Sequence, residues 1–269
     1  MEHVRHTDQM NREIWLPAFP QRIVSLVPSQ TEYLCTLGIG KRLVGRTLFC
    51  IHPEEGLKDV SRVGGTKKLQ LDKIRALQPD LIIGNKEEND QEQIELLSKD
   101  FPVWMSDIYH PKDAMTMMLA LGGILNLKTE AESIVAKIES GMLEISKKSD
   151  RFKGINVFYA IWKSPWMFAG KDTFIDSMLS LAGFTNLCDR LRYPEWSEKE
   201  IIHFHPDLLL LSSEPYPFSS KHIRELESIL PESRAILVDG EMFSWYGSRM
   251  LDFPAYLETL FTELHKKTP

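Results

Sequence analysis

The chain has 269 residues, 43% of them hydrophobic and 26% charged, and its formal net charge is −6 at pH 7. This composition is typical of a folded globular protein and excludes a disordered chain, and the length suffices for one large domain or two of ordinary size. The acidic balance, without any block of lysine and arginine, argues against a nucleic-acid partner.

Cysteine usage and hydropathy set further limits. Cys35, Cys50 and Cys188 are too few and too scattered for a disulfide framework or a zinc cage. Residues 1–20 hold no apolar run of the kind found in a secretory signal, and no segment reaches the roughly 18 uninterrupted apolar residues of a membrane helix. We therefore expect a cytoplasmic protein without membrane insertion; a leader removed before residue 1 would instead place it in the periplasm or outside the cell.

The first half of the chain alternates strands with helices. Residues 1–20 predict an extended N-terminal extension, because Pro17 and Pro20 exclude a helix there. Residues 21–110 predict an α/β lobe of parallel β-α-β units, with a helix after the first strand capped by Ser29 or Thr31 and a loop at 50–56. The expected strands cover residues 22–29, 41–47, 80–84 and 101–107.

Residues 111–150 have the apolar spacing of helices, with one interruption at Gly122 and Gly123. Thr129 and Glu132 match a capping box that restarts the helix. The second helix is about 30 Å long at 1.5 Å per residue, long enough to brace two lobes as their single connection.

The second half repeats the pattern of the first. A charged helical turn, an apolar turn, Pro-Asp-Leu and an aliphatic run occur at 71–84 and again at 198–212. Proline ends the helix, and the aliphatic run is typical of a strand buried on both faces. This duplication predicts a second α/β lobe over residues 151–269 and a ligand cleft between the two lobes.

The order of these segments resembles the helical-backbone (class III) substrate-binding proteins of ABC transporters, which bind vitamin B12, ferric siderophores or haem. The resemblance covers residues 22–265 and is strongest to the vitamin B12 branch. It rests on R-I-V-S-L-x-P-S-x-T-E at 22–32, L-G-I at 37–39, L-V-G at 43–45, H-P at 52–53, V-G-G-T at 63–66, D-K-I-x-A-L-x-P-D-L-I-I at 72–83 and A-G-K-D at 169–172.

The resemblance implies a cleft built from strand-to-helix loops of both lobes, and a metal-containing chelate as ligand rather than an intrinsic cofactor. The vitamin B12 binders place aromatic residues where Thr66 and Asn85 stand here. The ligand-binding positions that it implies are Phe49, Thr66 and Asn85 in one lobe, and the Trp162–Trp166 loop, Tyr193, Trp196, Trp245, Tyr246 and Arg249 in the other.

The resemblance also implies a partner, an ABC permease that binds one carboxylate from each lobe. The first position matches Asp72. The duplicate position is Lys199, a reversed charge, and its neighbours Glu198 and Glu200 are the acids that remain for docking. We expect a monomer with a small-molecule ligand.

Aromatic residues in predicted loops of the second half favour a large, flat ligand. Rigid rings give contact area at little entropic cost, although several of these rings could instead fill the core of their own lobe. The rings are Trp162, Trp166, Phe168, Trp196, Phe243, Trp245 and Tyr246.

Glu214, Tyr216 and Arg249 each have two possible roles. Glu214 follows the second buried strand at the edge where α/β ligands bind, so a cleft contact for it or for Tyr216 competes with a turn. Arg249 could bind an anionic group of the ligand or form an ion pair. Trp245→Ala and Arg249→Ala are expected to weaken binding with stability nearly unchanged.

No catalytic or metal motif emerges. His203 and His205 are too close in spacing, and lack the further ligands, to form a metal site; His52 and His110 remain as axial ligands to a chelated metal. Nucleophile motifs and catalytic carboxylate pairs are absent from the sequence. We predict a non-enzymatic solute-binding protein for cobalamin, a ferric siderophore or haem; the alternative is a cytoplasmic homologue that has left transport and handles a corrinoid or acts on a small polar substrate.

Overall fold

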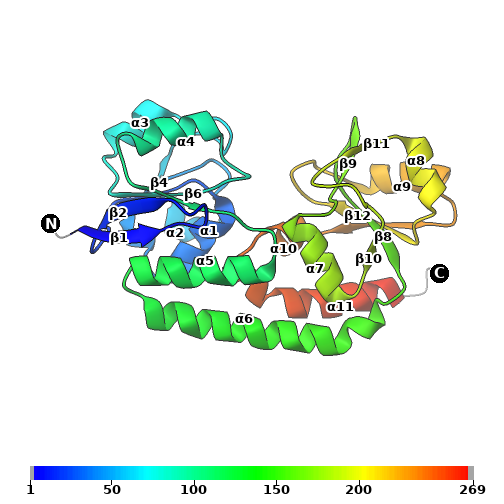
Figure 1. Ribbon diagram of the computed structural model, residues 1–269. Coiled ribbons are helices and arrows are strands. Elements are labelled where there is room, and N and C mark those ends of the chain that lie inside the picture. The colour runs from blue at the N-terminus through cyan, green and yellow to red at the C-terminus, as the bar shows by residue number, and fades with distance from the viewer. Residues whose placement is uncertain (1–2, 266–269) are drawn as a thin grey trace. The chain divides into compact units, whose positions relative to one another are not determined.

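The computed structural model describes residues 3–265, which divide into two compact units (Figure 1). Unit 1 comprises the residues up to Ile108, Lys112–Lys137 and Tyr246–Arg249. Unit 2 comprises Tyr109–Pro111, Ile138–Trp245 and the residues from Met250 onward. Each unit has its own β-sheet flanked by helices, which is the α/β class that the sequence predicted.

Unit 1 is built on a five-stranded parallel sheet of order β5-β4-β3-β6-β7. Helices α3 and α4 cover one face of it, where Ile74, Ile94 and Leu97 pack on Val24, Ile82 and Val103 (Figure 1). The elements are β3 (Ile23–Ser25), α1 (Pro28–Thr36), β4 (Leu43–Arg46), α2 (Glu54–Leu57), β5 (Ser61–Arg62), α3 (Leu71–Ala76), β6 (Leu81–Asn85), α4 (Gln91–Ser98), β7 (Val103–Ser106) and α5 (Pro111–Ile124).

Two details of this lobe differ from the sequence prediction. Helix α1 begins at Pro28 with Val27 as its N-cap, because proline fits the first helical position, so neither Ser29 nor Thr31 is the cap. The segment 50–56, expected to be a loop, contains the first residues of the short helix α2.

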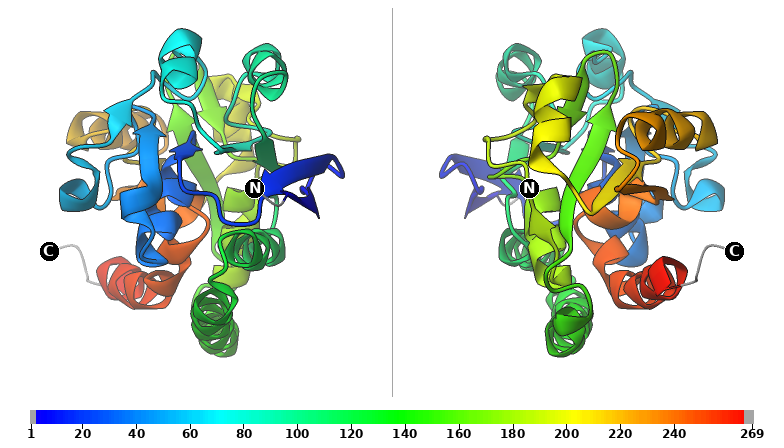
Figure 2. Two further views of the ribbon diagram at one scale, coloured as in Figure 1. Left: turned by 90° about the vertical axis from the view of Figure 1, so that its left-hand side faces the viewer. Right: turned by 90° about the vertical axis from the view of Figure 1, so that its right-hand side faces the viewer.

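The N-terminal residues are extended and without a helix, as the sequence predicted, and they pair into a hairpin that it did not predict. Strands β1 (His3–Thr7) and β2 (Glu13–Pro17) pair antiparallel, and the hairpin (blue) stands at one side of unit 1 in Figure 2. Its turn is fixed by Asp8, whose carboxylate accepts hydrogen bonds from the backbone N–H groups of Arg12 at 2.8 Å and Met105 at 3.2 Å. Arg12 in turn donates to the Val103 carbonyl at 3.0 Å, so the hairpin is tied to β7.

Unit 2 is built on a six-stranded sheet in which β8, β10, β12 and β13 run parallel, β9 pairs antiparallel with β8, and β11 pairs antiparallel with β9. One face packs on α8 and α9 through Phe158, Ala160, Ile201 and Leu226. On the other face, Tyr159 packs on Phe243 of α10 with ring centroids 5.2 Å apart. The elements are β8 (Asn156–Trp162), β9 (Trp166–Phe168), α7 (Phe174–Ala182), β10 (Thr185–Asn186), β11 (Glu195–Trp196), α8 (Glu198–Phe204), β12 (Leu208–Ser212), α9 (Ser220–Ile229), β13 (Arg234–Val238), α10 (Gly240–Ser244) and α11 (Phe253–His265).

The duplicated Pro-Asp sequence makes the same contact in both units. Asp80 accepts hydrogen bonds from the backbone N–H groups of Gln21 and Arg22, at 2.7 and 2.8 Å, just before β3. Asp207 accepts one from the N–H of Asn156, the first residue of β8, at 2.7 Å. In each unit the aspartate that precedes the buried strand therefore fixes the start of the neighbouring strand and sets the register of the pair.

The residue before each proline has a left-handed backbone. Gln78 has φ 45° and His205 has φ 46°, and His205 is the C-cap of α8. A left-handed residue satisfies the last carbonyls of a helix, and the proline after it prevents further helix. His205 therefore has a structural role as the residue that ends α8.

The helical segment contains α5 and α6 (Lys128–Lys148), but the break between them lies at residues 125–127 and not at the glycines. A Cβ on Gly122 would lie 2.3 Å from the Cβ of Ala131, so this glycine permits a close approach of α5 and α6 inside unit 1. Because α6 begins at Lys128, Thr129 lies within its first turn rather than before it.

Helix α6 is the long helix that the sequence predicted to join the two lobes. Its residues divide between unit 1 and unit 2 at Lys137 and Ile138. The chain also enters unit 1 again for Tyr246–Arg249 before it returns to unit 2 at Met250.

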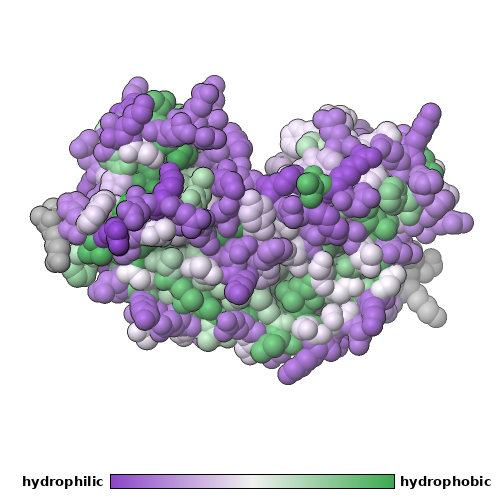
Figure 3. Space-filling view, viewed as in Figure 1, coloured by the Kyte–Doolittle hydropathy of each residue, from purple (hydrophilic) through white to green (hydrophobic). Residues whose placement is uncertain are grey.

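The surface in Figure 3 is mostly hydrophilic over the helices of the two units, with apolar side chains gathered along the lower edge over α5 and α6. Leu119 of α5 and Leu143 of α6 are 39% and 63% exposed. No helix within residues 3–265 combines the length and apolar character needed to cross a membrane.

The aspartate contacts give a matched pair of variants. Asp80→Ala and Asp207→Ala should each lower the free energy of unfolding by about 1–2 kcal/mol, because backbone donors lose a charged acceptor. Asp207→Asn should leave the free energy of unfolding nearly unchanged, because Asp207 uses only one carboxylate oxygen. Asp80 uses both oxygens, so Asp80→Asn should lower the free energy of unfolding by about half as much as Asp80→Ala. Urea denaturation measures all four; equal effects of the two asparagine variants would contradict this assignment.

Candidate functional site

In parallel sheets, ligands bind beyond the carboxyl ends of the strands, where the strand order reverses. In unit 1 the first strand, β3, lies between β4 and β6, so the loops after β4, β5 and β6 surround that point. In unit 2 the corresponding loops follow β8, β12 and β13. Of the ligand-binding residues predicted from the sequence, Phe49, Thr66 and Glu214 lie in these loops, and Asn85 and Trp162 are the last residues of β6 and β8.

The loop after β4 exposes an apolar patch. Phe49 is 57% exposed, and its neighbours Leu48 and Ile51 are 49% and 50% exposed. The Leu48 N–H donates to the Gly64 carbonyl at 2.8 Å, and a Cβ on Gly65 would lie 3.3 Å from Phe49. The loop after β4 and the loop that carries Thr66 therefore lie side by side, with Phe49 over the glycines.

Leu48 and Ile51 were not among the sequence candidates. Their signal in the sequence is an apolar run, Leu-Phe-Cys-Ile, directly after a strand, of which only Cys50 is buried. Thr66 is half-buried, and its carbonyl accepts a hydrogen bond from Asn89 at 3.2 Å.

Asn85, the last residue of β6, is buried and its side chain is bonded within the protein. Its amide oxygen accepts hydrogen bonds from the N–H groups of Glu87 and Glu88 at 2.8 and 3.1 Å. Its amide nitrogen donates to the Ser106 hydroxyl at 2.9 Å. Asn85 thus forms the turn after β6, and a ligand contact for it stays a prediction.

Tyr246 belongs to unit 1 and is buried there. Its hydroxyl donates to the Glu88 carboxylate at 3.3 Å, and burial raises its pKa well above the ordinary value. The next residue, Gly247, has φ 103°, a backbone conformation that residues with a side chain rarely adopt.

Arg249 forms an ion pair, the second of the two roles that the sequence left open. Its Nε and Nη2 atoms donate to the two carboxylate oxygens of Glu32 in α1, at 3.2 and 2.6 Å. The two side chains are only 14% and 17% exposed. Such a two-point pair is strong and directional, so it predicts a loss of stability for Arg249→Ala, whereas the sequence predicted nearly unchanged stability.

In unit 2 the structure brings together Trp162, Glu214 and Trp245. Trp162 ends β8, is 40% exposed and meets Tyr216 edge-on with ring centroids 5.3 Å apart. Glu214, in the same loop as Tyr216, accepts hydrogen bonds on one carboxylate oxygen from the Ser244 hydroxyl at 2.8 Å and the Trp245 indole N–H at 3.0 Å. Ser244, which the sequence analysis did not name, thus helps to orient the acid.

Burial raises the pKa of the Glu214 carboxyl above its ordinary value. The carboxylates of Glu241 and Asp239 act in the same direction, whereas the hydrogen bonds from Ser244 and Trp245 act against them. An acid at the carboxyl edge of a sheet with a perturbed pKa is typical of a functional site.

Trp166 and Trp196 lie in strands β9 and β11, and not in the loops expected from the sequence. They are 6% and 3% exposed and belong to the core under α8 and α9. Trp166 stacks on Phe218 with centroids 5.9 Å apart, and the Arg190 guanidinium lies 4.1 Å above Trp196. Phe168 and Phe243 are likewise buried in the core of unit 2.

Tyr193 is half-buried in the bend before β11. The Arg192 guanidinium lies 5.7 Å from its ring and 5.3 Å from the ring of Tyr109. A ligand contact for Tyr193 stays a prediction.

The predicted docking acids lie at helix N-termini. Asp72 is in the first turn of α3, and its fully exposed side chain contacts Arg75 at 3.2 Å. Glu198 is exposed in the first turn of α8. Glu200 closes a capping box with Ser197 and pairs with Arg190, which lowers its pKa to about 2.

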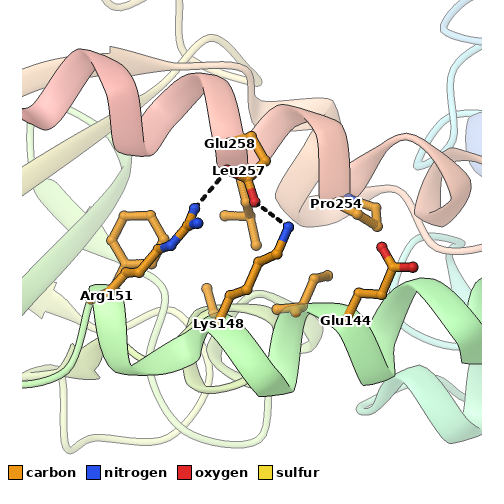
Figure 4. A pocket seen from close by; sticks show the side chains of 9 residues that line it. Glu144, Lys148, Arg151, Pro254, Leu257 and Glu258 are labelled. Atoms are coloured by element: carbon orange, nitrogen blue, oxygen red, sulfur yellow. Dashed lines mark hydrogen bonds and ion pairs between the residues drawn. The ribbon is translucent and has the colours of Figure 1, made fainter.

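Among residues 3–265, no group of three or more histidine, cysteine or acidic side chains is placed to hold a metal ion. A small pocket lies elsewhere in unit 2, between α6 and α11, where Glu258 pairs with Lys148 and Arg151 (Figure 4). These ion pairs join the C-terminal part of α6 and the segment after it to α11.

Residues 23–228 match the family described as Periplasmic binding protein, and the chain belongs to this family. It is 25% identical over 240 residues to a vitamin B12-binding protein of Pectobacterium carotovorum, covering 87% of this chain and 86% of that protein. An uncharacterized ABC transporter substrate-binding lipoprotein of Bacillus subtilis, YvrC, is 25% identical over 218 residues, covering 76% and 67%. The solved structure of the periplasmic haem-binding protein RhuT from Roseiflexus sp. RS-1 has the same fold, with a TM-score of 0.77 at 21% identity over 90% of this chain and 97% of that one.

The ion pair in unit 1 predicts a stability effect. Arg249→Ala should lower the free energy of unfolding by about 1.5–3 kcal/mol, because it leaves a half-buried Glu32 carboxylate without its donors. Glu32→Ala should cost a similar amount, and the double variant should cost less than the sum. Additive losses in urea denaturation would show that the pair contributes no coupling energy.

Glu214 predicts a pH effect of known sign. Its folded pKa is raised above the unfolded value, so its contribution to stability is present below the unfolded pKa and is lost as pH rises through the folded pKa. Relative to wild type, Glu214→Gln should therefore become more stable as pH rises from about 4 to 8. Denaturation curves across this range test it; a difference between the two proteins that does not depend on pH would contradict the raised pKa.

Proposed function

We propose that this protein is a solute-binding protein of the ABC-transporter type whose ligand is a metal chelate of the corrinoid, ferric siderophore or haem kind. The observation that carries the proposal is membership of the Periplasmic binding protein family together with accessible aromatic and apolar side chains at the carboxyl edges of both sheets. The similarity to a vitamin B12-binding protein over most of both chains supports this ligand class.

The accessible residues suit a ligand with a large apolar surface. Leu48, Phe49 and Ile51 in unit 1 and Trp162 in unit 2 leave between 40% and 57% of their surface exposed. Apolar side chains that are exposed together on a protein surface commonly mark a binding site. Each ring or aliphatic side chain that a ligand partly buries contributes about 1–2 kcal/mol to binding. The macrocycle of a corrinoid or a porphyrin offers such a surface.

The proposed protein binds without catalysis and needs no cofactor of its own. We propose Asp72 and Glu198 as the acids that meet an ABC permease, since both are exposed at helix N-termini. Glu200 is less suited, because Arg190 and the capping box already occupy its carboxylate.

A second candidate is a cytoplasmic homologue that has left transport. It is favoured by Lys199, an exposed cation between Glu198 and Glu200 at the position where a docking acid is expected. A lysine there would oppose contact with permease arginines. Co-purification with an ABC permease encoded beside the gene, strengthened by Lys199→Glu, would favour transport; an isolated gene would favour the second candidate.

The binding proposal is tested with purified protein and a panel of cyanocobalamin, a ferric hydroxamate siderophore and haem. We expect one of them to bind with a Kd of about 1 μM or tighter, corresponding to roughly 8 kcal/mol. Isothermal calorimetry and tryptophan quenching measure it. No heat and no quenching with any of the three would refute the proposal.

Two tryptophan variants separate ligand contact from core packing. Trp162→Ala should weaken binding about tenfold with the melting temperature nearly unchanged, because the exposed part of the ring loses only a ligand contact. Trp166→Ala should instead lower the free energy of unfolding by about 3–5 kcal/mol, as expected for a core aromatic. Calorimetry gives the affinity and urea denaturation the stability; the opposite pattern would exchange the two roles.

A further inference from the structure

Glu214 has the geometry of a fixed hydrogen-bond acceptor. One of its carboxylate oxygens, Oε1, accepts from Ser244 and Trp245, which holds the group in one orientation. The backbone at Gly240 lies against it, since a Cβ there would be 2.7 Å from the Glu214 Cγ. Within residues 3–265, no hydrogen bond to the second oxygen, Oε2, is recorded, and the side chain is only partly buried.

A pair of aromatic rings in edge-to-face contact lies in the loops on this side of the sheet. Trp162 and Tyr216 contact each other at the ends of the adjacent strands β8 and β12, and Tyr216 is two residues from Glu214. A ligand that covers the exposed part of Trp162 therefore places its rim near the carboxylate. The chemistry of that rim decides whether the contact is favourable.

The charges around Glu214 are negative. Its charged neighbours are Glu241 and Asp239, on α10 and just before it. Two cations of unit 2 that lie just after strands β8 and β9 are already paired, Lys163 with Glu225 and Lys171 with Asp176. A carboxylate brought to this edge would meet like charge, whereas an N–H or O–H donor would meet an acceptor that needs no reorganisation.

In unit 1, too, several cations already have partners within the protein. Arg249 is paired with Glu32, and Lys86 with Asp107 at 2.7 Å. Arg46 is 5% exposed and donates to the carbonyls of Leu57 and Cys50. These three cations are therefore already engaged within unit 1.

We propose that Glu214 selects ligands whose rim carries neutral hydrogen-bond donors, primary amides above all, and rejects ligands whose rim carries carboxylates. This inference rests on the proposed function and narrows it: among metal chelates, an amide-bearing corrinoid is favoured over haem, two of whose side chains end in carboxylates. Glu214 accepts from the ligand amide through Oε2 while Ser244 and Trp245 hold Oε1.

The test compares two corrinoids that share one macrocycle. Dicyanocobinamide carries amides on its rim, and dicyanocobyrinic acid carries carboxylates at the same positions. Wild-type protein should bind the amide form at least about tenfold more tightly at pH 7, as measured by calorimetry, because a charge-assisted hydrogen bond is exchanged for charge repulsion. This ratio needs no variant, so it stands whether or not a substitution folds.

The Glu214→Gln variant tests whether Glu214 causes this difference in affinity between the amide and carboxylate corrinoids. The glutamine oxygen can still accept hydrogen bonds from Ser244 and Trp245, while the amide nitrogen, a donor, replaces the acceptor oxygen Oε2. The amide-to-carboxylate ratio should fall about tenfold or more. Glu263→Gln, the same change at an exposed acid on α11, should leave the ratio unchanged.

The outcomes separate this inference from the proposed function. If no chelate binds the wild-type protein, the proposed function fails and this inference fails with it. If a chelate binds but the carboxylate form binds as tightly as the amide form, the inference alone is overturned. It is also overturned if a folded Glu214→Gln protein, with unchanged near-ultraviolet circular dichroism, keeps the wild-type ratio.

Discussion

The fold of each unit depends on one aspartate that joins two strands at their amino ends. Asp80 binds the backbone at Gln21 and Arg22, and Asp207 binds that at Asn156, so the first strand and the buried strand of each sheet start in register. A slip by one residue would turn every side chain to the opposite face. The left-handed residues before the prolines, Gln78 and His205, give each helix the same end before the strand begins.

Because the register is fixed at the amino ends, the carboxyl ends are free to differ between the two units. Unit 1 ends its strands in a buried polar group around Asn85 and Ser106, with the apolar Leu48, Phe49 and Ile51 exposed nearby. Unit 2 ends its strands in Trp162 and an oriented acid, Glu214. The duplicated part of the sequence thus carries the fold, and the part that differs carries the candidate site.

The sequence predicted those parts of the fold that depend on local signals. Proline, aspartate and an aliphatic run act over a few residues, so the buried strands and the two α/β lobes could be predicted. The N-terminal hairpin could not, because Asp8 is fixed by Met105, 97 residues away in the chain. Nor could the partner of Arg249, which lies 217 residues earlier.

The aromatic residues show the same limit within the candidate site. Trp162 and Trp166 are four residues apart and look alike in the sequence. Pairing of β9 with β8 and β11 places Trp166 opposite Trp196 and in the core, while Trp162 stays 40% exposed. Only the sheet pairing, which is a long-range property, distinguishes a core ring from a ring that a ligand can reach.

Glu200 and Glu214 of unit 2 have pKa values shifted in opposite directions. Glu200 has a depressed pKa because Arg190 and Ser197 bond its ionised form, so its charge favours the folded state. Glu214 has a raised pKa because burial and two neighbouring acids oppose its ionised form, so its charge opposes folding. An acid that costs stability, is oriented by two donors and keeps one oxygen towards the carboxyl edge of its sheet has no evident role in the fold itself. Residues that break a local rule of stability in this way are typical of sites that bind, and under the proposal above a ligand donor to the remaining oxygen would recover the cost.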